Sequence, residues 1–90
     1  MARIVRQFQV TNRLGLHLRA AAKIVQASNG FRASITMTND GKPANAKSIM
    51  SIATLAAGQG RWVTVEVDGD DAEQAVAALE ALFAEKFGED

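Results

Sequence analysis

The residues best suited to chemistry lie in one short segment, residues 14–22, which contains the only histidine of the chain, His17. A glycine-containing loop runs here into an alanine-rich stretch, and Arg19 follows the histidine by two positions. Backbone N–H groups in the first turn of a helix have no partner within the helix, so they attract anions such as phosphate. A neutral imidazole beside them is a nucleophile, and a guanidinium receives new oxyanions well. The pattern indicates phosphoryl acceptance on His17, with a solvated surface histidine and arginine as the alternative.

The composition excludes several other classes of function. Ninety residues suffice for one domain with a single core, which we expect to span residues 1–90. Ten Lys+Arg balance ten Asp+Glu, so no overall charge draws the chain to nucleic acid or to an anionic membrane. The absence of cysteine excludes disulfides and thiolate chemistry, and one histidine without suitably spaced carboxylates predicts no metal site. We expect no cofactor.

The chain also lacks targeting and membrane signals. Its first six residues, MARIVR, contain no apolar stretch of a signal peptide, and no run of apolar residues approaches the length of a membrane span. We therefore expect a cytoplasmic monomer that does not insert into a membrane.

The hydrophobic pattern predicts the elements that must position His17. Alternation of apolar and polar residues predicts strands, helical spacing predicts helices, and glycine-rich segments predict turns. The expected strands are 3–10, 31–38, 42–46 and 61–67; the expected helices are 17–28, 48–55 and one from about 72 to 87–88. Asn29-Gly30 should end the first helix with a left-handed glycine, and residues 68–71 should turn and cap the last helix. Asp40-Gly41 predicts a tight hairpin, and Pro43 places the strand that follows at a sheet edge.

This order, β-α-β-β-α-β-α, predicts the fold class. Two of the strands have a polar second face, so the sheet should be antiparallel, with helices covering one side only. The expected class is α+β.

Two motifs then resemble one known family. Residues 15–21, GLHLRAA, resemble the Gly-hydrophobic-His-x-Arg-Pro-Ala signature of the HPr family, the histidine-containing phosphocarriers of the bacterial phosphotransferase system. A second match, KSIM at 47–50 followed by Leu55 and GQG at 58–60, lies about thirty residues on. The resemblance spans essentially the whole chain. It implies an open-faced β-sandwich, with a four-stranded antiparallel sheet and three helices on one face.

The resemblance also implies roles for residues and partners. Enzyme I, which draws on phosphoenolpyruvate, would phosphorylate His17 at Nδ1, and an EIIA-type acceptor would receive the group. Arg19 would steady the phosphoryl oxygens. Such a protein carries a group without turning over a substrate of its own.

Ala20 departs from the family pattern, which has proline at this position. Proline in a first helical turn lacks an N–H that would have no helical partner anyway. Alanine restores that N–H. If His17 is the N-cap residue, the extra donor either helps to hold the phosphoryl group or competes for the attacking nitrogen.

Ser48 has two interpretations. It should cap the short helix that follows, which is a sufficient reason for serine here. In one branch of the family, however, the matching serine is phosphorylated by a dedicated HPr kinase, which weakens enzyme I binding. A phosphate is electrostatically tolerated at a helix start, so modification need not unfold the site.

The short helix should also expose apolar side chains. Four of them spread over an arc of about 220° at helical spacing, more than one core face can bury; they are Ile49, Met50, Ile52 and Leu55. We expect Ile49 and Met50 to be exposed and available to a partner, with Leu18 extending the patch. The alternative is a helix buried on two sides.

Two choices stay open at this point. The middle of the chain favours the sugar-uptake carrier, whereas Asn12 to Gly15 and the tail from Phe83 to Asp90 favour the nitrogen-related paralogue. A carrier kept mainly for regulation is a further reading, because of Ala20. The rival from another class, a small nucleic-acid-binding module, requires exposed aromatic residues and a basic face, but the charge is balanced.

Overall fold

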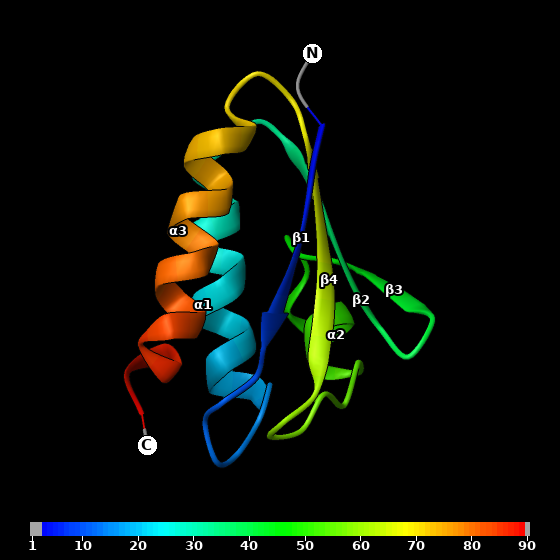
Figure 1. The fold of residues 1–90 in the computed structure, drawn as a ribbon, viewed down its shortest axis with the longest axis vertical. Helices are drawn as coiled ribbons and strands as arrows, with labels where there is room; N and C mark the ends of the chain where they lie inside the picture. Colours follow the sequence, from blue (N-terminus) through cyan, green and yellow to red (C-terminus); the bar gives the residue numbers. More distant parts are fainter. Residues whose placement is uncertain (1–2, 90) are drawn as a thin grey trace.

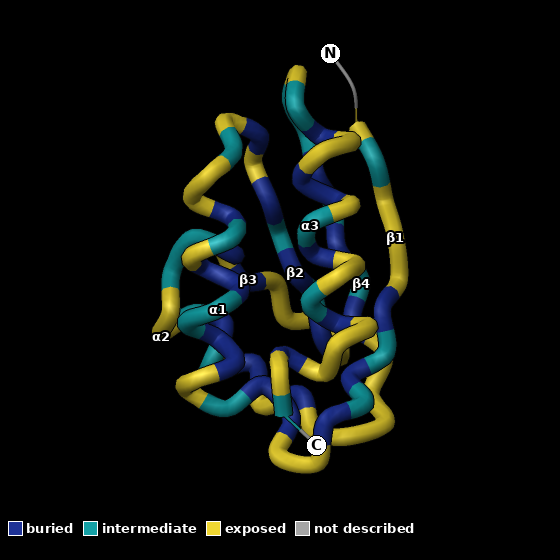
Figure 2. Tube along the Cα trace, turned by 90° about the vertical axis from the view of Figure 1, so that its left-hand side faces the viewer, coloured by how far each residue is buried: buried dark blue, intermediate teal, exposed yellow. Residues whose placement is uncertain are grey.

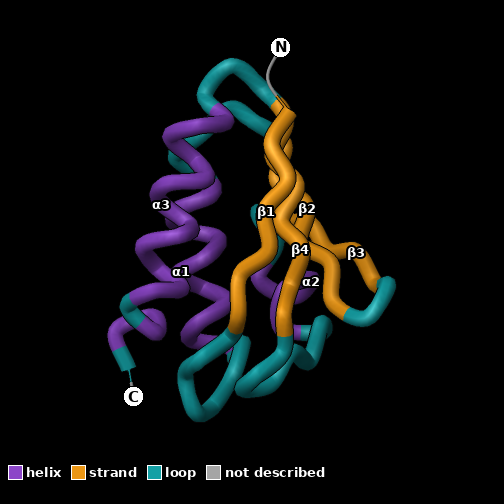
Figure 3. Tube along the Cα trace, viewed as in Figure 1, coloured by secondary structure: helices purple, strands orange, loops and turns teal. Residues whose placement is uncertain are grey.

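The computed structural model describes residues 3–89, which form one mixed sheet-and-helix unit. Four antiparallel strands lie in the order β1-β4-β2-β3, and the α-helices lie against one face of this sheet (Figure 1). The other face is open. The elements are β1 (Arg3–Gln9), α1 (Leu18–Ser28), β2 (Ser34–Asn39), β3 (Lys42–Asn45), α2 (Ile49–Ala53), β4 (Trp62–Asp68), α3 (Ala72–Ala84) and the 3-10 helix η1 (Lys86–Gly88). The predicted order and the predicted antiparallel sheet are confirmed; Figure 3 shows the two layers.

Alternation along the strands separates the two faces of the sheet. In β4, Val63, Val65 and Val67 are buried, whereas Trp62 is exposed and Thr64 is half-buried on the open face. Most of β1 is exposed, and the helices show a buried side and an exposed side along their length (Figure 2). No helix among residues 3–89 combines the length and the apolar content that crossing a bilayer requires.

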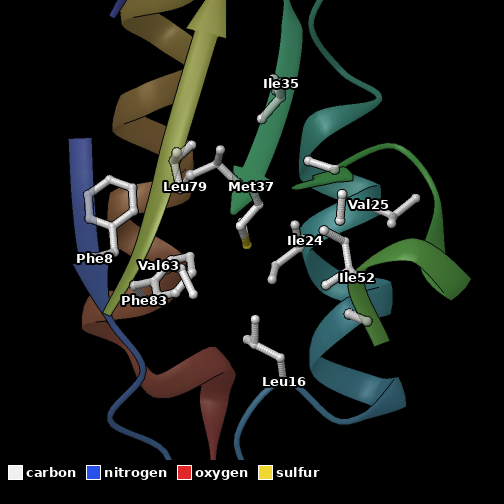
Figure 4. Close-up of a cluster of buried hydrophobic side chains, with 14 of the residues drawn as sticks. Phe8, Leu16, Ile24, Val25, Ile35, Met37, Ile52, Val63, Leu79 and Phe83 are labelled. Carbon is white, nitrogen blue, oxygen red and sulfur yellow. The ribbon is translucent and has the colours of Figure 1, made fainter. Parts of the chain in front are cut away.

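The core lies between the sheet and the helices. Figure 4 shows one buried cluster that includes Phe8, Met37 and Val63 from the strands, Ile24 from α1 and Leu79 from α3. Aromatic contact reinforces the end of the core nearest the site, since the rings of Phe8 and Phe83 lie 5.1 Å apart. Burial of these side chains is the main force that holds the helices on the sheet.

The predicted strand 31–38 begins later than expected, at Ser34. The reason is a side chain from elsewhere in the chain: the Asp71 carboxylate accepts hydrogen bonds from the N–H groups of Arg32 (2.8 Å) and Ala33 (2.9 Å). The same contact corrects the predicted cap of the last helix. Asp71 occupies the N-cap position of α3, but its side chain makes no bond to that helix.

Helix α1 starts and ends within one residue of the prediction. It spans Leu18–Ser28, with His17 as the N-cap residue. The expected left-handed glycine at its end is wrong, because Gly30 is not among the glycines with positive φ. A turn ends the helix instead, in which the Gly30 N–H donates to the Ala27 carbonyl at 3.1 Å.

The hairpin between β2 and β3 has the tight turn that the sequence predicts. Asp40 and Gly41 have φ of 54° and 79°, the left-handed values that a two-residue turn requires. Strand β3 lies at the edge of the sheet, as Pro43 predicted.

Candidate functional site

His17 caps helix α1 with its own ring. Its backbone is extended (φ −70°, ψ 177°), and its Nδ1 accepts a hydrogen bond from the Arg19 N–H at 3.2 Å. The side chain keeps 23% of its surface exposed. The ring is therefore reachable from solvent, and its Nδ1 lies at the start of the helix, where backbone N–H groups favour negative charge.

The loop before His17 is fixed by a close backbone contact. Gly15 has φ +69°, and a Cβ at this position would lie 2.6 Å from the Ala57 carbonyl oxygen and 2.9 Å from the Gly58 Cα. The next residue, Leu16, donates its N–H to the same carbonyl at 3.0 Å. Only glycine allows this approach, so the loop holds His17 against the segment that follows α2.

The other nitrogen of the ring contacts an acidic residue at the far end of the chain. His17 Nε2 lies 2.8 Å from both Oε1 and Oε2 of Glu89. Asn12 completes the arrangement, because its Nδ2 donates to Glu89 Oε1 at 2.8 Å and to the Gly15 carbonyl at 2.7 Å. Figure 1 shows the C-terminal end of the chain at the same end of the molecule as this loop.

These contacts keep Glu89 ionised. Hydrogen bonds from Asn12 and then from His17 hold the pKa of the Glu89 carboxyl below its ordinary value, against the opposing effect of burial. An ionised carboxylate only accepts hydrogen bonds. We therefore assign the ring proton to Nε2, which leaves Nδ1 as the acceptor from Arg19.

The tail reaches the site through a sharp change of direction. Helix α3 ends at Ala84, not near 87–88 as predicted, and η1 follows. Lys86 and Phe87 both adopt left-handed backbone conformations, with φ of 56° and 57°. These conformations turn the chain from the end of α3 towards the start of α1.

Comparison with known proteins agrees with this arrangement. The family model described as "PTS HPr component phosphorylation site" matches residues 4–85. The chain belongs to the HPr family of the phosphotransferase system. It is 46% identical over 84 residues to phosphocarrier protein HPr of Xylella fastidiosa strain Temecula1, covering 93% of this chain and 94% of that protein. It is 40% identical over 83 residues to phosphocarrier protein NPr of Escherichia coli K12, covering 91% and 92%.

The fold matches the HPr family as well. A crystal structure of HPr from Thermoanaerobacter tengcongensis superimposes with a TM-score of 0.88 at 41% identity, covering 100% of this chain and 99% of that one. The expected open-faced β-sandwich is therefore confirmed. This HPr-family chain is a phosphocarrier of the phosphotransferase system.

The Arg19 side chain and Ala20 do not contact the His17 ring through hydrogen bonds within residues 3–89. The Arg19 guanidinium is exposed and forms no ion pair within residues 3–89, so it is available to an anion. Ala20 is fully buried at the third helical position. The His17 ring takes its bond from Arg19 N–H, which corrects the version of the Ala20 hypothesis in which Ala20 competes for Nδ1.

Ser48 caps α2, as the sequence predicts. Its Oγ accepts a bond from the Ser51 N–H at 3.4 Å, a long and therefore weak contact. The helix itself is shorter than the predicted 48–55, because it ends at Ala53. The Ser48 side chain is half-buried at the helix start.

The expected apolar surface is present. Leu18 and Met50 are 61% and 66% exposed, and Ile49 is 38% exposed, whereas Ile52 and Leu55 are buried. The alternative of a helix buried on two sides is therefore wrong. Leu14, which was not among the residues expected in this surface, is 66% exposed and borders a shallow depression shared with His17.

Two residues of the site cannot be recognised from the sequence alone. Asn12 and Glu89 lie in segments that resemble one branch of the family, and that resemblance implies no role for either residue. Glu89 lies 72 positions from His17, so no local spacing links them. The part of the chain between residues 3 and 89 holds no group of three or more residues arranged as metal ligands.

Proposed function

We propose that this chain accepts a phosphoryl group on His17 Nδ1 from phospho-enzyme I and donates it to an EIIA-type protein in the cytoplasm. The observation that carries the proposal is the state of the ring: Nδ1 lies at a helix start with its lone pair directed to an N–H group, while Nε2 is occupied by Glu89. Family membership supplies the class of partners.

The transfer exchanges one P–N bond for another. The Nδ1 lone pair attacks the phosphorus of a phosphohistidine on enzyme I, and the electron pair of the broken P–N bond stays with the donor nitrogen. His17 loses no proton, because its proton is on Nε2. The phosphorylated ring is then cationic, and Glu89 lies in position to balance that charge.

The environment of Nδ1 favours the developing oxyanions. Once Nδ1 bonds to phosphorus, the Arg19 N–H no longer has its ring acceptor and becomes free for a phosphoryl oxygen. The exposed Arg19 guanidinium adds charge, and bidentate contacts to phosphate suit its geometry. We assign to Arg19 the role of steadying the transferred group.

The exposed apolar residues supply a docking surface next to the ring. Leu18 follows His17 directly, and α2, which carries Ile49 and Met50, packs against α1. Burial of apolar surface is the dominant favourable term in most protein–protein association. The proposal therefore includes contact of Leu18, Ile49 and Met50 with enzyme I, and with EIIA-type acceptors in turn.

Ser48 supports a second, regulatory role. Its hydroxyl makes only a weak cap contact, and the exposed Ile49 and Met50 follow it directly. A phosphate on Ser48 places charge beside an apolar surface, which weakens docking by desolvation. We propose that an HPr serine kinase, where one is present, lowers enzyme I binding in this way.

One experiment tests the carrier function. The protein is incubated with phosphoenolpyruvate and enzyme I, and its intact mass is measured before and after acid treatment. A gain of one acid-labile phosphoryl group, absent in His17→Ala and kept in Ser48→Ala, supports the proposal. The absence of a gain with a cognate enzyme I, or a gain that persists in His17→Ala, contradicts it.

An extension of this experiment distinguishes the sugar branch of the family from the nitrogen branch. Relatives named HPr and NPr match the chain at 46% and 40% identity. Transfer from the phosphorylated protein to a sugar-branch EIIA and to a nitrogen-branch EIIA, compared at equal concentrations, assigns the acceptor. We expect transfer to the sugar-branch protein to be the faster one, because the motif around Ser48 is of that type.

A further inference from the structure

The contact between Glu89 and His17 is largely buried and is supported by a third residue. The Glu89 and His17 side chains are 17% and 23% exposed, so this pair is largely shielded from water. Asn12, which anchors Glu89, is fully buried. Surface ion pairs, by contrast, hold long side chains in solvent and contribute little.

The Asn12 amide is oriented by its two acceptors. One carboxylate oxygen of Glu89 and the Gly15 carbonyl oxygen both face the same nitrogen, at 2.8 Å and 2.7 Å. A flipped amide would bring an oxygen against two oxygens, which is repulsive. The Asn12 Oδ1 is buried and finds no donor within the part of the chain that the structure describes. Asn12 therefore acts here through the two N–H groups of its side-chain amide, which both donate hydrogen bonds.

The tail that carries Glu89 is fixed independently of the site. The Phe87 side chain is 1% exposed and packs edge-to-face on Phe83, with ring centres 4.9 Å apart. Lys23 of α1 donates its ammonium group to the Phe87 carbonyl. Gly88 has φ +75°, and a Cβ there would lie 2.9 Å from the Lys23 Nζ. The carboxylate is therefore brought to the ring by packing, not by its charge alone.

We propose that Glu89, held in place by Asn12, is a positioning residue that fixes the Nε2–H tautomer of His17 and so directs phosphorylation to Nδ1. This inference rests on the proposed carrier function. A neutral imidazole has two tautomers, and only the one with its proton on Nε2 has a lone pair on Nδ1. Glu89 accepts that proton's hydrogen bond before transfer and pairs with the cationic ring after it. The phosphoryl group stays on Nδ1 until an acceptor nitrogen attacks it.

The test compares Glu89→Gln with Glu85→Gln. Glu85 lies in the same tail and is exposed, so its replacement removes the same charge without touching the ring. Nitrogen-15 NMR of the His17 ring reports the tautomer directly, and enzyme I-dependent phosphorylation gives the rate. We expect Glu89→Gln to increase the Nδ1–H form and to slow phosphorylation about tenfold, the range for losing one charged hydrogen bond. Glu85→Gln should resemble the wild type in both measurements.

A second variant separates positioning from folding. Asn12→Ala leaves Glu89 in the chain but removes its anchor, and it should shift the tautomer in the same direction while circular dichroism shows a folded protein. Unchanged tautomer populations and rates in Glu89→Gln overturn this inference even when His17 is phosphorylated normally. If His17 accepts no phosphoryl group at all, the carrier proposal fails, while the tautomer measurement still decides the role of Glu89.

Discussion

The carboxylate of Asp71 accepts a hydrogen bond from the backbone N–H of Ala33 at 2.9 Å, although the two residues are 38 positions apart. A second bond, from Arg32 at 2.8 Å, makes the contact bidentate. The start of α3 is thereby tied to the segment that enters β2. This contact is part of the framework that holds the helices over the sheet.

The contact predicts a loss of stability in acid. The bond from Arg32, and then that from Ala33, hold the pKa of the Asp71 carboxyl below its ordinary value. Such a group stabilises the fold above its unfolded pKa, about 3.9, and this contribution disappears as pH falls through the lower folded value. We expect Asp71→Asn to lower Tm at pH 7, with the difference from wild type shrinking below about pH 4. A difference that stays constant across this range would contradict the prediction; Asp70→Asn, at an exposed neighbour, is the control.

Replacement of Gly15 by alanine should disrupt the site loop. The added Cβ would lie 2.6 Å from a backbone oxygen at a positive φ. Gly41→Ala is the matched control, since it has φ +79° but nothing within 4 Å. Left-handed strain alone should cost Gly41→Ala about 1–2 kcal/mol, and Gly15→Ala should lose more. Urea unfolding measures both, and equal losses would show that the contact with Ala57 is unimportant.

Replacement of Ser48 by alanine should separate the two roles of this residue. Loss of an N-cap typically lowers the free energy of unfolding by about 1 kcal/mol, and the weak bond here places the effect at or below that value. Phosphorylation of His17 should be unaffected. Ser51→Ala is the control. It keeps the backbone N–H that donates to the Ser48 Oγ, so it should unfold like the wild type. A loss of phosphotransfer in Ser48→Ala would assign the hydroxyl a direct role.

Replacement of Met50 by serine should weaken partner binding without changing the chemistry. Met50 is 66% exposed in α2, so its loss creates no cavity. We expect KM for enzyme I to rise about tenfold, because the apolar burial of one side chain is lost from the interface, with kcat unchanged. Val5→Ser, at a 44% exposed position on β1, removes a comparable apolar side chain from the edge strand of the sheet. A similar rise in both variants would place the docking surface elsewhere.

Replacement of Ala20 by proline tests the departure from the family signature. The cap should persist, because its donor is the N–H of Arg19. Proline removes the N–H of residue 20, one of the donors in the first turn of α1. We expect slower phosphorylation and faster loss of the phosphoryl group. Rates equal to those of the wild type would show that the Ala20 N–H plays no part.

The sequence predicted the site where it is built locally. His17, Leu18 and Arg19 are neighbours in the chain, and a glycine before an alanine-rich stretch is enough to place them at a helix start. The exposure of Met50 followed from counting apolar residues on a short helix. Elements with regular alternation, such as β4, were predicted within one residue.

The remaining features depend on contacts between distant segments. Asp71 takes the N–H groups of residues 32 and 33, so the alternating pattern there does not become strand. Glu89 reaches His17 only because Lys86 and Phe87 adopt left-handed conformations that residues other than glycine rarely take. In these conformations Phe87 is buried against Phe83, and no pattern in the sequence indicates this contact.

Pro43 also bears on how the protein behaves at high concentration. The register Asn39↔Lys42 and Thr38↔Pro43 next to a two-residue turn directs the Pro43 nitrogen away from β2, to the outer edge of the sheet. A strand from another molecule that paired with this edge would lack one hydrogen bond here, because the proline ring has no N–H to donate. The exposed Lys42 beside it adds a charge that an incoming strand would have to accommodate. This edge is thereby protected against aggregation by strand addition.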